Sequence, residues 1–108
     1  MTRLAPYPSR DELLAAVRIV FGADAHDAIR SLDEIDLSLW KESRARVQMA
    51  VMALSEGALD KLRQFTAEAN RDYRNVLYWS EFTRAGAECR LALERRLADA
   101  GQSPWKRA

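Results

Sequence analysis

Apolar residues are densest between Val47 and Leu54, where seven of eight consecutive side chains are apolar. This run lies inside a longer helical pattern from about 38 to 56. A surface helix usually carries one apolar stripe, whereas a helix that is apolar most of the way round is buried on several sides. We therefore expect a central helix here, with its stripe of Met49 and Met52 covered by the first helix or by a second copy of the chain.

Capping residues and helical spacing predict two helices before this segment. Ser9 and Glu12 form a capping-box pattern, which predicts a first helix at about 10–21. Asp24 is expected to cap a second, short helix over about 25–34. The residues expected on its inner face are Ala25, Ala28, Ile29 and Leu32.

Helical spacing continues after the central helix, from 58 to 82. The polar triplet Asn70, Arg71 and Asp72 lies in the middle, and Asn or Asp can cap a helix as readily as continue one. One long helix and two helices broken near Asn70 both fit the pattern. Thr83 is expected to cap a last helix that ends at Gly101. The residues expected to point inward from that helix are Ala85, Cys89, Ala92, Leu93 and Leu97.

These elements predict an all-α, single-domain bundle of about five helices around a central helix at about 38–56. A chain of 108 residues suits one domain. We expect an extended N-terminal arm over 1–8, because each of its two prolines disfavours helical backbone in the residue before it. The helical domain then spans 9–101, and 102–108 form a C-terminal tail.

Composition limits the classes of partner and the compartment. The formal net charge is +1, so the chain as a whole has little attraction for nucleic acid or an anionic membrane. A single cysteine suits a reducing compartment. The sequence shows neither a secretory signal nor an apolar run long enough for a membrane span. These features predict a cytoplasmic protein.

Few residues offer catalytic or metal-binding chemistry. His26 lies between Asp24 and Asp27, but zinc sites need three or four protein ligands, and no further ligands lie nearby in the sequence. We expect His26 at the surface and Cys89 buried as a small apolar side chain. The sequence also lacks a phosphate-binding glycine loop and a nucleophile elbow. It therefore predicts no catalytic residue, no metal, no cofactor and no enzymatic activity.

The segment 70–82 is the most suggestive candidate surface. It combines more aromatic and arginine side chains than one narrow buried stripe holds, and these residue types are enriched at binding hot spots. One interpretation is that the aromatic residues close one end of the bundle. The other is a surface for a protein partner or for self-association. The residues of this candidate interaction surface are Arg71, Tyr73, Arg74, Tyr78, Trp79 and Phe82.

The run Asp72-Tyr73-Arg74-Asn75-Val76-Leu77-Tyr78-Trp79-Ser80-Glu81 follows a helix start at Gly57-Ala58-Leu59. It resembles a motif, Asp-Tyr-Arg-[Asp/Asn]-Val-Leu-x-Trp, in a family of small bacterial helical proteins without an established activity. The resemblance covers about residues 37–82. Asn75 and Ser80 depart from the commonest form of the motif. The resemblance implies a helical fold and no functional residue.

Two hypotheses of function follow. The first is a non-catalytic protein-interaction module or homodimer that uses the Tyr73–Phe82 face. The alternative is a nucleic-acid-associated regulator that uses an arginine stripe on the last two helices. That stripe would consist of Arg71, Arg74, Arg84, Arg90, Arg95 and Arg96.

Overall fold

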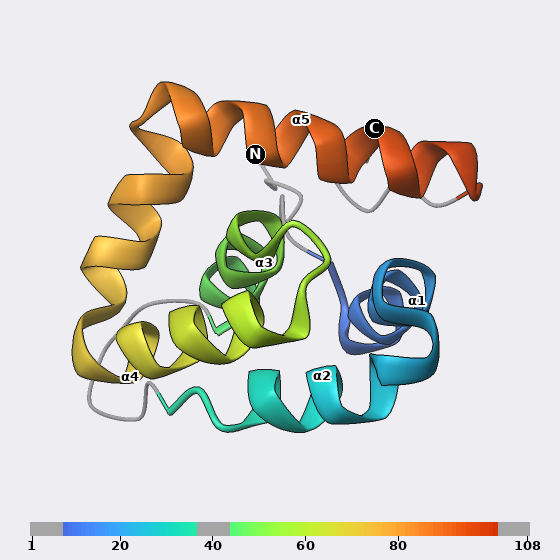
Figure 1. Ribbon diagram of the computed structural model, residues 1–108, viewed down its shortest axis with the longest axis horizontal. Helices are drawn as coiled ribbons and strands as arrows, with labels where there is room; N and C mark the ends of the chain where they lie inside the picture. The colour runs from blue at the N-terminus through green and yellow to red at the C-terminus, as the bar shows by residue number, and fades with distance from the viewer. Residues whose placement is uncertain (1–7, 37–43, 102–108) are drawn as a thin grey trace, which may run out of the picture.

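The computed structural model describes residues 8–36 and 44–101, and within them every regular element is a helix (Figure 1). The all-α prediction is confirmed. The expected arm over 1–8, apart from its last residue, and the expected tail over 102–108 lie outside the described residues. In chain order the elements are α1 (Arg10–Phe21), the short 3₁₀ helix η1 (Gly22–Asp24), α2 (Ala25–Asp33), α3 (Arg44–Ser55), α4 (Leu59–Glu81) and α5 (Arg84–Asp99).

Local sequence signals set both ends of α1. The Glu12 backbone N–H donates to Ser9 Oγ at 3.2 Å, and the Ser9 N–H donates to Glu12 Oε1 at 2.8 Å. This is the predicted capping box. The helix ends where Gly22 takes a φ of 52°, a conformation that glycine adopts without steric cost.

The start of α2 differs from the prediction in one detail. Asp24 precedes the helix as expected, but its side chain makes no capping hydrogen bond. The reason is its backbone, because Asp24 lies in the 3₁₀ turn with a φ of −88° and a ψ of 4° rather than in the extended conformation of a typical N-cap. On the expected inner face Ala25, Ala28 and Leu32 are buried, and Ile29 is half-buried.

The helix α3 is buried from Val47 to its end, as the apolar run predicts. Every residue from 47 to 55 is buried. Met49 and Met52 are at most 4% exposed, so the single chain itself covers this stripe. The buried Gln48 side chain donates from Nε2 to the Leu32 carbonyl at 3.0 Å, which satisfies its amide nitrogen. The helix begins at Arg44, and the part of the prediction over 38–43 lies outside the described residues.

The long helix α4 contains a kink at Asp72, where the backbone is extended with a φ of −160° and a ψ of 96°. Asp72 Oδ1 accepts a hydrogen bond from the Arg74 N–H at 3.1 Å, which caps the second half of the helix. The predicted break near Asn70 therefore lies two residues later. Asn70 instead binds the end of α2, accepting from the Asp36 N–H at 2.8 Å and donating to the Glu34 carbonyl at 3.0 Å.

The helix α5 closes the bundle after a tight corner. Thr83 caps it as predicted, because its Oγ1 accepts from the Gly86 N–H at 3.0 Å. Leu93 and Leu97 are buried. Ala85 and Ala92, which were expected to point inward, are exposed and line a pocket beside α3 instead of packing in the core. Their methyl groups are too short to fill the space between α5 and α3, and a pocket remains there.

Candidate functional site

The second half of α4 forms one edge of the molecule (Figure 1). After the kink the helix changes direction and runs along that edge to meet α5. Val76, Leu77 and Ser80 point into the core and are buried. Tyr78 and Phe82 are four residues apart, a spacing that places them on one side of a helix.

Tyr78 and Phe82 project from this edge. Tyr78 is 57% exposed and Phe82 is 71% exposed. Their rings stack with centroids 6.2 Å apart and an interplanar angle of 25°. The stack holds the two rings as one raised apolar surface. The interpretation that these two aromatic residues close the end of the bundle is therefore not what the structure shows.

The other two aromatic residues of the segment are more enclosed. Trp79 is 39% exposed and meets the Phe65 ring edge-on, with centroids 6.0 Å apart. Tyr73 is half-buried against the hydrophobic core. Tyr73 therefore contributes to the packing of the core. Trp79 lies at the boundary between the core and the exposed surface, where it contacts Phe65. We call Tyr78, Trp79 and Phe82 together the aromatic patch.

Arg71 and Arg74 are exposed near the kink, and each is paired with a carboxylate. Arg71 Nη2 donates to Glu68 Oε1 at 2.6 Å. Arg74 Nε donates to Asp72 Oδ1 at 2.9 Å. The hydrogen bond from Arg74 lowers the pKa of Asp72 below its ordinary value. The positive charge near the patch is therefore balanced locally.

Three of the four remaining arginines of the stripe, Arg84, Arg90 and Arg96, also contact other groups of the chain. Arg84 lies 3.8 Å from a Glu88 carboxylate oxygen. Arg90 Nε donates to the Ser80 carbonyl at 2.9 Å, which ties α5 to α4. Arg95 is exposed. Arg96 donates from Nη2 to the Ile19 carbonyl at 3.4 Å. Arg90 and Arg96 of the stripe therefore form hydrogen bonds with backbone carbonyls of other helices.

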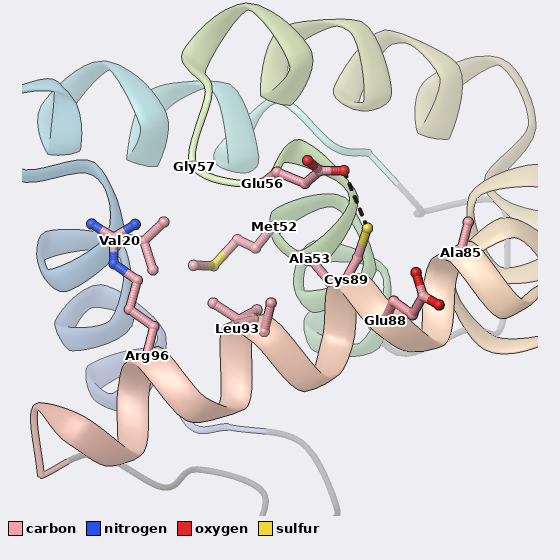
Figure 2. Close-up of a pocket in the computed structure, with 11 residues that line it drawn as sticks. Val20, Met52, Ala53, Glu56, Gly57, Ala85, Glu88, Cys89, Leu93 and Arg96 are labelled. Carbon is pink, nitrogen blue, oxygen red and sulfur yellow. Dashed lines mark hydrogen bonds between the residues drawn. The ribbon is translucent and has the colours of Figure 1, made fainter.

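A pocket of about 380 Å³ lies between α5, the C-terminal end of α3, the turn that follows it and the end of α1 (Figure 2). No short motif in the sequence marks this site. The available signal was the row of small inward positions on α5, where Ala85, Cys89 and Ala92 leave space. The lining residues are Val20, Met52, Ala53, Glu56, Gly57, Ala85, Glu88, Cys89, Ala92, Leu93 and Arg96.

Cys89 is half-buried at the edge of this pocket rather than fully buried as expected. Its Sγ donates to Glu56 Oε1 at 3.4 Å (Figure 2). Burial raises the pKa of the Cys89 thiol, and the hydrogen bond and negative charge of Glu56 raise it further. The thiol is therefore held in its neutral, weakly nucleophilic form.

His26 is exposed, as predicted. Across residues 8–36 and 44–101, no cluster of three or more histidine, cysteine, aspartate or glutamate side chains is arranged to hold a metal ion. Within the same ranges no helix combines the length and the apolar character that crossing a membrane requires. The cytoplasmic location and the absence of catalysis stay predictions.

Comparison of the chain with protein-family models, with curated proteins and with solved structures gives no match. The resemblance of the 72–81 motif to bacterial helical proteins therefore stays a prediction.

Proposed function

We propose that the protein is a non-catalytic interaction module that forms a homodimer through the aromatic patch. The observation that supports this proposal is the exposure of two stacked rings, Tyr78 and Phe82, on a segment whose other face is firmly buried. Exposed apolar surface of this kind is typical of protein contact sites, and aromatic residues are enriched in them.

The surroundings of the patch favour a second copy of the chain over a strongly charged partner. The nearby cations Arg71, Arg74 and Arg84 each lie beside a carboxylate of the same chain. The charge of these three arginines is therefore compensated within the chain. The net charge of +1 adds little repulsion between copies. A twofold contact places the same patch on both sides, so apolar rings meet apolar rings.

The size of the patch indicates a weak dimer. Burying one large apolar side chain contributes about 1.5–3 kcal/mol relative to leaving it exposed. Tyr78 and Phe82 are already partly covered, so four rings in a dimer contribute about 4–8 kcal/mol in total. Association costs about 4–15 kcal/mol before any net affinity appears. We therefore expect reversible, concentration-dependent association.

The experiment is sedimentation velocity over a concentration series. The test variant carries Tyr78→Ser and Phe82→Ser, which removes both projecting rings without touching the core. The matched control is Leu91→Ser, because Leu91 is a large apolar side chain that is 51% exposed on α5 outside the patch. We expect the wild type and the control to shift toward a dimer with concentration, and the double variant to remain a monomer.

Two results contradict the proposal. One is a wild-type chain that stays at its monomer mass of 12.3 kDa over the whole series. The other is equal dimerisation of the double variant and the wild type, which would place the contact elsewhere. Circular dichroism of both variants confirms that their helical fold is intact before the masses are compared.

A further inference from the structure

The pocket along α5 resembles small-molecule binding sites in its volume and in the composition of its lining. Its volume of about 380 Å³ falls within the range of roughly 300–1,000 Å³ that is usual for ligand pockets. Met52 and Leu93 line its middle, Val20 lies beside Arg96 at one end, and further charged side chains lie toward the other end (Figure 2). An apolar middle with a few polar groups at the ends is the usual composition of such sites.

The two ends carry opposite charge. Arg96 reaches across the end next to α1, where its Nη1 atom is in van der Waals range of a Cβ placed on Gly57. Glu56 and Glu88 lie toward the other end, with Cys89 between their two side chains (Figure 2). A ligand in the pocket is therefore oriented by charge.

The charges at the two ends differ in how they are compensated. Glu56 has Lys61 Nζ at 3.7 Å and also accepts from the Cys89 thiol. Glu88 has Arg84 at 3.8 Å. Arg96, in contrast, makes one long hydrogen bond to a backbone carbonyl and pairs with no carboxylate among the described residues. Guanidinium groups carry five N–H donors that match a carboxylate in a bidentate geometry.

We infer that this pocket binds a small organic monocarboxylate with an apolar body. Its carboxylate lies on Arg96, and its hydrocarbon part lies on Val20, Met52 and Leu93. A second carboxylate on the ligand would meet Glu56 and Glu88, so dicarboxylates are disfavoured. None of the residues that line this pocket belongs to the aromatic patch, and the inference does not depend on dimer formation.

Octanoate is a suitable probe, with 1-octanol and octylammonium as neutral and cationic counterparts of equal chain length. Binding is followed by NMR titration of the ¹³C-labelled methyl groups of Val20, Met52 and Leu93. We expect saturable shifts with octanoate, weaker effects with octanol and none with octylammonium. Arg96→Gln is expected to weaken octanoate binding about tenfold or more, the loss typical of a charge-assisted hydrogen bond.

Matched controls separate binding from folding. Arg95→Gln removes the same charge from the neighbouring, exposed position of α5, outside the pocket, and should bind octanoate like the wild type. Ala92→Phe should fill the pocket and abolish binding, while Ala98→Phe, at another exposed position of α5 outside the pocket, should not.

Three results overturn the inference. The first is the absence of saturable shifts at the pocket methyl groups with octanoate. The second is tighter binding of octylammonium than of octanoate, which would assign the site to the two carboxylates. The third is octanoate binding that Arg96→Gln and Ala92→Phe leave unchanged, which would place the ligand elsewhere on the protein. Folding of each variant is checked by its methyl spectrum without ligand.

Discussion

The corner between α4 and α5 depends on Gly86. A Cβ added at this position would lie 1.8 Å from the Trp79 carbonyl oxygen and 2.6 Å from the Ser80 carbonyl oxygen. Both atoms belong to the backbone, so they cannot move aside as a flexible side chain does. Gly86→Ala therefore forces α5 away from the end of α4, and we expect the variant to be less stable.

The two contributions to stability have opposite signs. Alanine is a better helix former than glycine by about 0.8–1.0 kcal/mol in a helix interior, which favours the variant. Overpacking typically costs about 1–3 kcal/mol, and a contact this short against backbone lies at or above the upper end. Displacement of α5 also strains the hydrogen bond from Arg90 to the Ser80 carbonyl. We expect a net loss of about 2 kcal/mol or more.

Urea unfolding followed by circular dichroism at 222 nm measures this loss. The control is Ala87→Gly at the next position of α5, which changes helix propensity without a backbone clash. The control should lose up to about 1 kcal/mol. If Gly86→Ala proves as stable as the wild type, or more stable, helix propensity outweighs the clash. The backbone of α4 then does not approach Gly86 as closely as described.

Three further predictions concern the pocket edge, an exposed ion pair and the core. Glu56→Gln should lower the pKa of Cys89 and so speed its alkylation by iodoacetamide at pH 8, whereas an unchanged rate would exclude Glu56 as a cause of the raised pKa. The hydrogen bond from Arg10 lowers the pKa of Asp33 in the folded state, so the stability that this carboxylate contributes is present above the ordinary pKa of aspartate and is lost as pH falls through the lowered value. Asp33→Asn should therefore reduce the fall in thermal stability between pH 5 and about pH 2, and an identical acid profile would contradict the pairing. Leu62→Ala should cost about 2–5 kcal/mol in urea unfolding, because Leu62 is fully buried, and a loss below about 1 kcal/mol would argue against its place in the core.

Local signals made much of the fold predictable from the sequence. The capping box of Ser9 and Glu12, the stop at Gly22 and the cap at Thr83 each depend on residues a few positions apart, so a single sequence contains all their information. The continuous apolar run 47–54 likewise predicts a helix that is covered on several sides.

Details that depend on distant segments were not predictable in the same way. Asn70 does not cap a new helix. Its side chain instead forms hydrogen bonds with the backbone of Glu34 and Asp36, just after α2. Asp72 is the residue that caps the second half of α4, through its hydrogen bond from the Arg74 N–H. Ala85 and Ala92 have the spacing of core residues, yet both are exposed and line a pocket between α5 and α3. Sequence spacing gives the face of a helix, but it does not give the distance to the helix opposite.

For the candidate sites, too, features set by nearby residues were predictable, and features that depend on distant segments were not. The excess of aromatic residues over 73–82 indicated a surface, because a helix buries only one face, and Tyr78 and Phe82 do project. The same pattern also predicts Tyr73 on that surface, but Tyr73 packs against the core. The pocket has no signature in the sequence, because its lining comes from α1, α3, the following turn and α5, and no short motif joins them.

The central proposal is that two copies of the chain meet through Tyr78 and Phe82. Its most direct test is an isotope-filtered NOE experiment on an equimolar mixture of ¹³C-labelled and unlabelled protein, which records contacts between copies only. We predict intermolecular NOEs between the ring protons of Tyr78 and Phe82 that disappear on dilution. A sample that sediments as a dimer but shows no intermolecular NOE from either ring would contradict the proposal.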